Sequence, residues 1–439
     1  MTSSGRPGRF PTCARAWGNS APPPRPQPGR RAGLFCWRRA AGGDDDPVPP
    51  SFEVQLRSYA EVIVRVGLNL GAGQRLLIAD PYELQGVAPG AGDLVAAVET
   101  AARSAGADAV RVIWGDEARL RRAARDGPGW LFRARLRRNT SRMLRHAEHG
   151  DALLFLQGSH PRLLADLPAA GVARLRQRTA ALFGVMAAQL TAGATNWTLA
   201  AAPTPAWADA VYPDLPAEQR LPALWAALFE ACRAPAPDPL RAWSEHLAGL
   251  ERRREELNAR RPATVRFRGP GTDLTVALPR EHVWCTARLA TRGGRPFVAN
   301  LPTEEVFTLP HKDSAEGTVR VGRPVTCGGA VVDGIELEFH RGGVTRARAR
   351  TGEEFLHRLL AIDAGAARLG EVALVPEATS IARTGRLFHH PLLDENACSH
   401  IALGEAYGFT LRMPDATVFN RSLIHVDLPL DPACEVGFA

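Results

Sequence analysis

The sequence predicts an α/β layer structure over residues 51–262, followed by a β-rich domain over residues 263–439. Three observations lead to this prediction. At 439 residues the chain is longer than one hydrophobic core normally supports, which favours two domains. In the first part, short apolar segments alternate with amphipathic segments of helical period. After residue 262, short segments bounded by glycine replace that alternation.

The first part contains two expected helices and three expected strands. Residues 55–67 and 93–106 carry apolar side chains at helical spacing. Residues 74–80, 107–115 and 151–157 are short apolar segments that read as strands. Strands that alternate with helices pair in parallel, so we expect a parallel sheet with helices packed on it.

A charged helix is expected to join the two parts. Residues 238–260 carry Trp243 and leucines close to heptad spacing, and Pro239 and Pro262 mark the ends of this segment. One side of the helix therefore buries an apolar stripe. The stripe is too short to predict a coiled-coil partner.

The second part is expected to be rich in strands. Residues 263–278 alternate between polar and apolar side chains and turn at Gly269-Pro270-Gly271, as a β-hairpin does. The other expected strands are residues 317–321, 330–339, 343–349, 369–375 and 422–428, and the expected helices are residues 353–368 and 395–407.

The positive net charge of the chain is concentrated in its first residues. Residues 1–40 hold eight of the 54 Lys and Arg residues and no acid, which leaves 46 basic residues against 46 Asp and Glu in the rest. We therefore expect residues 1–50 to be a disordered Arg/Pro-rich tail, either a transit peptide or a stretch translated ahead of the true start. A neutral body excludes a nucleic-acid groove, and no apolar run is long enough for a membrane span or a secretory signal.

Local patterns argue against a zinc or redox site built on paired cysteines, and against a nucleotide-dependent oxidoreductase. The seven cysteines include no Cys-x-x-Cys pair, so we expect free thiols and a cytoplasmic protein. A nucleotide-dependent oxidoreductase would fit the α/β half, but Gly71-Ala72-Gly73 precedes the first strand. A dinucleotide-binding loop needs its glycines after that strand.

Two histidines in the last third of the chain are candidate metal ligands. On a strand, His425 and Asp427 share one face and can bind a cation together, although a structural His–Asp hydrogen bond is the alternative. On a helix over residues 395–407, with Asp394 as its N-cap, His400 and Tyr407 share one face. Glu395 reaches the same cluster only from a frayed first turn.

Two glutamates lie in unusual surroundings. Glu371 interrupts an apolar strand, where an acid is costly unless it is paired, bound to a cation or at an exposed edge. Glu304 and Glu305 precede the apolar pair Val306-Phe307, where they could also form a capping turn. With the histidines these acids make an oxygen-rich set that suits two divalent cations: Glu305, Glu371, Glu395, His400, His425 and Asp427. A structural zinc site would use cysteine, and the zinc-protease motif His-Glu-x-x-His is absent.

Four motifs in order resemble the thermophilic metallopeptidase family. They are residues 300–308 (NLPTEEVFT), 369–376 (LGEVALVP), 393–407 (LDENACSHIALGEAY) and 424–427 (IHVD), and the resemblance runs from about residue 58 to residue 427. It implies a Rossmann-like, three-layer α/β N-terminal domain and a β-rich catalytic domain. It also implies an aminopeptidase that uses two divalent metal ions, zinc or cobalt, with magnesium and manganese as further activators.

The resemblance assigns roles to single residues. The metal ligands fall on Glu305, Glu371, Glu395, His400, His425 and Asp427, with Glu305 preferred to Glu304 by spacing, and Tyr407 matches a tyrosine beside the site. The implied partners are peptides with a free N-terminus and a second copy of the chain in a homodimer. The segment after Asp427 is shorter than in the family, so the alternative is a catalytically impaired relative that acts as a binding protein.

Overall fold

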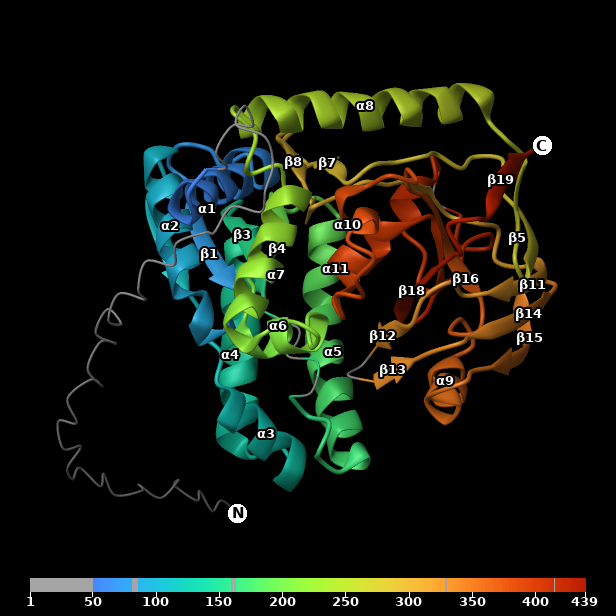
Figure 1. Cartoon of the computed structure of the whole chain (residues 1–439), viewed down its shortest axis with the longest axis horizontal. Coiled ribbons are helices and arrows are strands. Elements are labelled where there is room, and N and C mark those ends of the chain that lie inside the picture. Colours follow the sequence, from blue (N-terminus) through green and yellow to red (C-terminus); the bar gives the residue numbers. More distant parts are fainter. Residues whose placement is uncertain (1–49, 81–85, 159–160, 162, 328–329, 414) are drawn as a thin grey trace, which may run out of the picture. The chain divides into compact units, whose positions relative to one another are not determined.

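The computed structural model describes residues 50–80, 86–158, 161, 163–327, 330–413 and 415–439 (Figure 1). The expected tail at residues 1–50 therefore lies, apart from Pro50, outside the described residues. Contacts group Pro49–Ala439 into one unit. The expected mixture of parallel α/β layers and antiparallel sheets is confirmed in this unit.

The first sheet is parallel and has the strand order β2-β1-β3-β4-β9. Three of its strands lie where the apolar segments predict them. The strands are β1 (Arg75–Ala79), β2 (Ala109–Val112), β3 (Ala152–Gln157), β4 (Trp197–Ala201) and β9 (Asn300–Leu301). Strands β4 and β9 were not predicted, and β9 arrives from the second part of the chain, about a hundred residues after β4.

Helices cover both faces of this sheet, because successive strand residues point to opposite sides. Leu76 and Ile78 of β1 pack with α1 (Phe52–Glu61), the π-helix η1 (Val62–Gly67), α2 (Gly92–Ser104) and α7 (Ala217–Ala231). Leu77 and Ala79 pack with α4 (Trp130–Glu148) and α5 (Ala169–Thr191). The other helices of this part are η2 (Pro89–Ala91), α3 (Glu117–Asp126) and α6 (Pro205–Val211).

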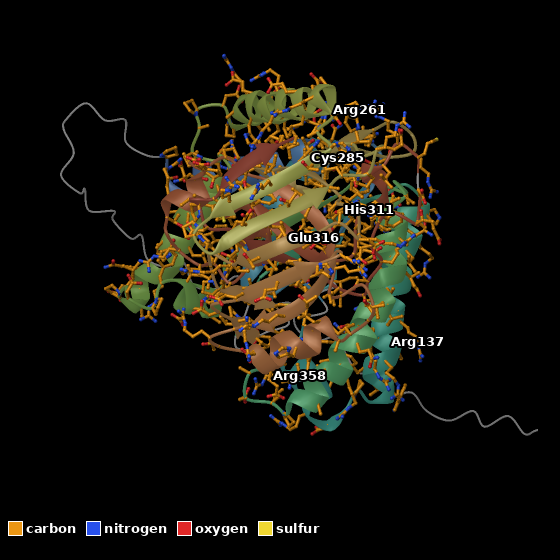
Figure 2. All side chains as sticks on the ribbon, turned by 90° about the vertical axis from the view of Figure 1, so that its right-hand side faces the viewer. Arg137, Arg261, Cys285, His311, Glu316 and Arg358 are labelled. Carbon is orange, nitrogen blue, oxygen red and sulfur yellow. The ribbon has the colours of Figure 1, made fainter. Side chains whose placement is uncertain are left out.

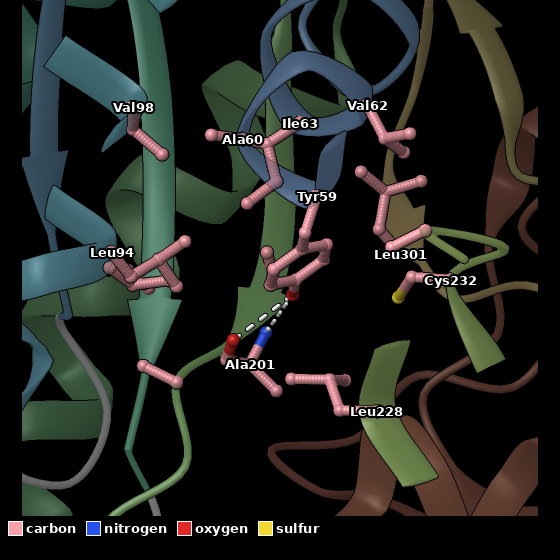
Figure 3. Packing of buried hydrophobic residues seen from close by; sticks show 14 of the residues in the cluster. Tyr59, Ala60, Val62, Ile63, Leu94, Val98, Ala201, Leu228, Cys232 and Leu301 are labelled. Atoms are coloured by element: carbon pink, nitrogen blue, oxygen red, sulfur yellow. Dashed lines mark hydrogen bonds between the residues drawn. The ribbon is translucent and has the colours of Figure 1, made fainter. Parts of the chain in front are cut away.

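Tyr59 of α1 fixes one of these helices to the sheet (Figure 3). Its ring is fully buried, and its hydroxyl donates to the carbonyl oxygen of Ala201 at 3.0 Å and accepts from the Ala201 amide at 3.2 Å. A buried phenol is satisfied only when its hydroxyl finds such partners. Helix α1 therefore meets the carboxyl end of β4 in one register.

Helix α8 (Pro239–Arg260) begins and ends where the prolines predict it. Its buried residues are Trp243, Leu250 and Leu257, which repeat every seven positions and form the expected single stripe. Trp243 belongs to the apolar cluster of the first sheet, whereas Leu250 and Leu257 belong to the cluster of the antiparallel sheets. The helix therefore buries one stripe against both clusters.

Two antiparallel sheets form the second part. The four-stranded sheet has the order β10-β16-β17-β18, with β10 (Val306–Thr308), β16 (Leu369–Leu374), β17 (His400–Gly404) and β18 (His425–Pro429). The six-stranded sheet has the order β15-β14-β11-β6-β5-β19, and Figure 2 views its polar outer face, which carries Glu316. Its strands are β5 (Thr264–Gly269), β6 (Thr272–Ala277), β11 (Glu316–Arg320), β14 (Glu336–His340), β15 (Gly343–Arg348) and β19 (Glu435–Phe438).

Short elements connect these sheets. The strands are β7 (Arg288–Ala290), β8 (Pro296–Val298), β12 (Val325–Cys327) and β13 (Ala330–Val332), and the helices are α9 (Glu353–Leu360), α10 (Ser380–Arg383), α11 (Pro391–Asp394), η3 (Glu395–Ala397) and η4 (Gly408–Thr410). None of the helices in the described residues is long and apolar enough to span a membrane.

Three local predictions were wrong. The helix expected over residues 353–368 ends at Leu360, because Asp363 accepts the amides of Gly365 and Ala366 in a turn. The strand expected over residues 330–339 is divided at Gly334, which has φ of 64°. The helix expected over residues 395–407 is instead a short 3-10 turn followed by strand β17, and Asp394 ends α11 rather than capping a new helix.

Candidate metal centre

Three neighbouring strands carry candidate ligands on one face of the four-stranded sheet. Glu371 of β16 lies opposite Ala402 of β17, and Ala402 lies opposite Asp427 of β18. Directly paired residues point to the same side of a sheet. His400 and His425 each lie two positions before a member of this row, so their side chains share that side. Four of the six predicted ligands are thus brought together by strand register alone.

Glu305 joins this face from the segment between two sheets. Strand β9 pairs with β4 in the parallel sheet, and Val306, five residues after the end of β9, pairs with Leu374 of β16. Glu305 therefore lies where the chain passes from one sheet to the other. Its carboxylate is buried, and Oε2 lies 3.3 Å from Nε2 of His400.

The ligand atoms form two overlapping groups. Glu305, Glu371 and His400 make one group, and Glu371, His425 and Asp427 make the other, with all atoms of a group within 4.8 Å of one another. Oε1 of Glu371 lies 3.5 Å from Nε2 of His400, and Oε2 lies 3.8 Å from Nε2 of His425. Glu371 thus offers one carboxylate oxygen to each group.

Glu395 reaches the second group from the 3-10 turn η3. It is half-buried, and a hydrogen bond joins its carboxyl to that of Asp427. The sequence placed Glu395 and His400 on one helix, where their angular separation kept them apart. Because the chain turns at η3 and then enters β17, both side chains reach the cluster without a frayed helix.

Backbone carbonyls orient both imidazoles. Nδ1 of His425 lies 2.8 Å from the carbonyl oxygen of Glu405, and Nδ1 of His400 lies 3.3 Å from that of Cys398. A carbonyl oxygen only accepts, so Nδ1 carries the proton in both rings. Nε2 of each ring therefore faces the cluster, which is the arrangement that metal-ligating histidines commonly adopt.

The close approach of several acids shifts the pKa of the groups in the cluster. Burial, and then the charge of Glu371, raise the pKa of Glu305; burial, and then the charge of Glu305, raise the pKa of Glu395. Burial alone would lower the pKa of His400, but the hydrogen bond to Glu371 and the nearby carboxylates outweigh it and raise that pKa to about 9.

His425 and Asp427 form an ion pair in which each group favours the charged form of the other. Their ring and carboxylate lie 3.3 Å apart. Burial opposes the charged form of each group, but their mutual contact prevails, raising the pKa of His425 to about 10 and lowering that of Asp427. Without metal, positive charge in the cluster is therefore carried by protons on the imidazoles.

The residues fit divalent cations. Among the described residues, the buried Oε2 of Glu305 makes no hydrogen bond and lies 3.3 Å from Nε2 of His400, so a cation bound between these two atoms would give the oxygen a partner. The two groups contain carboxylate oxygens and imidazole nitrogens and no thiol. Four acids in one buried cluster need compensating positive charge, and two divalent cations would supply it.

Glu304 does not belong to this cluster. Its Oε1 accepts from Nη2 of Arg233 at 2.9 Å, and its Oε2 lies 3.7 Å from Nε2 of His246. The structure thus separates the adjacent glutamates, with Glu305 toward the ligand groups and Glu304 toward α8. This separation agrees with the preference for Glu305.

Tyr407 lies at the open side of the cluster. Its ring centroid is 5.0 Å from that of His425. The side chains of His425 and Asp427 retain 22% and 16% exposure, whereas those of His400, Glu305 and Glu371 retain 8% or less. Solvent therefore reaches the cluster from β18, beside Tyr407.

Sequence reasoning gave no role to Asn396, which organises the acids. The buried Asn396 accepts the amide of Glu304 through Oδ1 at 2.6 Å and donates through Nδ2 to the carbonyl of Leu392 at 2.8 Å. It also lies 3.3 Å from Oε1 of Glu395. No spacing rule identifies such a residue, because Glu304 lies 92 positions from Asn396 in the chain.

Comparisons with known proteins agree with this geometry. The model of the family described as Thermophilic metalloprotease (M29) matches residues 52–434. Aminopeptidase T of Thermus thermophilus is 42% identical over 391 residues, covering 86% of this chain and 92% of the relative. Aminopeptidase AmpS of Bacillus subtilis (strain 168) is 32% identical over 393 residues, covering 86% and 92%.

A solved structure extends the likeness to three dimensions. Wild-type AmpT from Thermus thermophilus matches with a TM-score of 0.79 and 40% identity, covering 88% of this chain and 96% of that chain.

Proposed function

Because the chain belongs to the thermophilic metalloprotease family (M29), we propose that it is a metallo-aminopeptidase whose site holds two divalent cations. It releases N-terminal amino acids from peptides. The observation that carries the two-cation site is the position of Glu371 in both ligand groups, with one oxygen directed to each. Glu305 and His400 complete one group; His425 and Asp427 complete the other, with Glu395 beside Asp427.

The chemistry of the site divides between the cations and the chain. When bound, two such cations lower the pKa of a water and polarise the carbonyl of the peptide bond to be cleaved. Tyr407, beside His425 at the open side, is positioned to donate to the carbonyl oxygen as negative charge develops on it. The exposed edge of Asp427 and His425 receives the free amino group, which confines cleavage to the end of a peptide.

A carboxylate of the cluster accepts the proton that the attacking water loses. Glu304 is excluded from this role, because its two oxygens are directed to Arg233 and His246. Glu305 and Glu395 remain, because both carboxyls lie against the ligand groups.

Several finer properties belong to the same proposal. Zinc or cobalt suits the mixed nitrogen and oxygen ligands, and magnesium or manganese suits the carboxylates. The five cysteines in the described residues are free thiols, which supports a reducing, cytoplasmic environment. The proposal also includes a homodimer, a Rossmann-like first domain at residues 51–262 and a catalytic domain at residues 263–439. The parallel sheet with helices on both faces supports the first domain.

The test is metal-restored hydrolysis of leucine p-nitroanilide. The purified chain is stripped with a chelator and titrated with cobalt or zinc, while nitroaniline release and bound metal are both measured. We expect activity to appear as two equivalents of metal bind. Full activity with one equivalent would remove the two-cation site. Tight metal binding without hydrolysis of any aminoacyl substrate would favour a binding protein instead.

A further inference from the structure

Three aromatic rings line the approach to the candidate metal centre. The ring of Tyr407, next to His425, stacks on that of Phe409 with centroids 5.5 Å apart and an interplanar angle of 20°. Phe307 meets both rings edge-on, at 6.3 Å from Tyr407 and 6.2 Å from Phe409. We refer to Phe307, Tyr407 and Phe409 as the aromatic wall.

The backbone holds this wall rigidly beside the ligands. Phe307 lies on β10, two positions after Glu305, and its amide and carbonyl both bond to Cys285. The amide and hydroxyl of Thr410 both donate to the carbonyl of Tyr407, closing the turn that carries Phe409. A rigid support matters because a subsite contributes to selectivity only when its walls do not move away from the ligand.

Exposure increases outward along the wall. Phe307 retains 6% exposure and Tyr407 is half-buried, whereas Phe409 retains 37%. The open side of the cluster is the same side, at His425 and Asp427. An apolar ring surface is thus left in solvent at the entrance to an otherwise buried polar site. Contact with an apolar ligand would remove that surface from water.

Resting on the aminopeptidase function proposed above, we propose that the aromatic wall is the subsite that receives the side chain of the substrate's N-terminal residue. It selects large apolar side chains, with Phe409 as the specificity-determining residue. In an aminopeptidase substrate, that side chain branches from the carbon next to the carbonyl under attack. It must therefore lie beside the cluster, and Tyr407 and Phe409 extend from His425 toward solvent there.

The ring geometry favours aromatic and branched aliphatic side chains over small ones. A flat face made by stacked rings gives offset or edge-on contact to a phenyl group and dispersion contact to a leucine. An alanine methyl offers far less apolar surface for such contact. A guanidinium could also lie over such a face, so an arginyl substrate belongs in the test.

The experiment compares p-nitroanilides of phenylalanine, leucine, alanine and arginine with the metal-loaded chain. We expect Phe409→Ala to lower kcat/KM for the phenylalanyl and leucyl substrates by roughly tenfold and to leave the alanyl substrate nearly unchanged. Phe409→Tyr should retain the wild-type order. Met413→Ala is the matched control, since Met413 is an exposed apolar residue on the same segment.

A binding measurement separates this proposal from the proposed function. Isothermal titration of L-phenylalanine and L-alanine into the metal-loaded chain requires no turnover, and Phe409→Ala should weaken only phenylalanine binding, by roughly tenfold. Absence of hydrolysis by the wild type, with this binding difference intact, would remove the aminopeptidase function alone. Equal losses for alanyl and phenylalanyl ligands, a loss confined to the arginyl substrate, or no loss at all would overturn the subsite.

Discussion

Glu371 is the residue on which both ligand groups depend. Replacing it by glutamine keeps the shape of the side chain but removes the charge that two cations would share. We expect Glu371→Gln to lower aminopeptidase activity by roughly a thousandfold or more and to weaken binding of both metal equivalents. Glu336→Gln, on an exposed position of β14, is the matched control. Activity of Glu371→Gln within tenfold of wild type would contradict the assignment.

His390 gives the chain a pH dependence that does not involve the ligand cluster. Its ring is buried against Trp207 with centroids 5.0 Å apart, its Nδ1 has no hydrogen-bond partner, and burial lowers its pKa to about 4. In the unfolded chain this ring titrates near 6.5, so only the unfolded state gains a proton between pH 6.5 and 4. The free energy of unfolding should therefore fall by about 3 kcal/mol as pH decreases through that window.

His390→Phe should remove this contribution. The wild type and His390→Phe would be unfolded with urea in chelator at several pH values. The contributions of the other titrating groups cancel in the difference between the two free energies of unfolding. We expect that difference to change by about 3 kcal/mol between pH 7 and pH 4. A difference independent of pH would mean that His390 is already protonated in the folded chain.

At the scale of elements, Gly404 fixes the junction between β17 and β18. It has φ of 101°, and a Cβ there would lie 2.1 Å from the carbonyl oxygen of Ile424. Because Gly404 pairs with His425, any shift of this junction displaces a candidate ligand. We expect Gly404→Ala to lower the free energy of unfolding by at least about 2 kcal/mol and to weaken metal binding.

Gly184→Ala provides the matched control for that substitution. Gly184 lies within α5, and no described atom outside the helix's own backbone approaches the position of its Cβ within 4 Å. Alanine should stabilise this helix by roughly 0.5–1 kcal/mol. Denaturation midpoints of the two variants should therefore move in opposite directions, and similar shifts would show that Gly404 is not strained.

The helices and strands that could be predicted are those whose conformation follows from the apolar and polar residues within the segment itself. Strand β16 is a short apolar run and helix α8 has a clear apolar period, and both lie where expected. Residues 400–404 contain alanine and leucine, which favour helix, yet all five are buried between β16 and β18. Two flanking strands override that preference, and a single sequence does not reveal which neighbours a segment will have.

The candidate site was more predictable than the path of its backbone. The six ligand types and their order along the chain indicated two divalent cations, and all six side chains converge in the structure. The roles of Asn396 and of the Arg233–Glu304 pair depend on contacts between distant residues, which no local spacing encodes. Of the aromatic wall, the sequence predicted a role for Tyr407 only, because the contacts of Phe307 and Phe409 also join residues that are distant in the chain.

For the whole molecule, metal should act as a folding ligand. The cluster exists only when β10, β16, β17, β18 and η3 are assembled, so cations bind the folded chain far better than the unfolded one. A cation at a hundredfold excess over its Kd should add about 2.7 kcal/mol per site to the free energy of unfolding. Calorimetry with chelator, zinc and cobalt should show unfolding temperatures that rise with metal concentration. Unfolding temperatures that are independent of metal would exclude a site of this affinity.

Strand β9 has a consequence for synthesis of the chain on the ribosome. Strands β1 to β4 are complete when Ala201 has been made, but Asn300 and Leu301, which cover the outer edge of β4, come about a hundred residues later. At ordinary translation rates that interval lasts roughly 5–20 s. During it the edge of β4 offers unpaired amide and carbonyl groups to any neighbouring nascent chain. Growing chains on one messenger are thus most prone to misassociate between these two points, and the same short strand that leads to Glu305 ends the exposure.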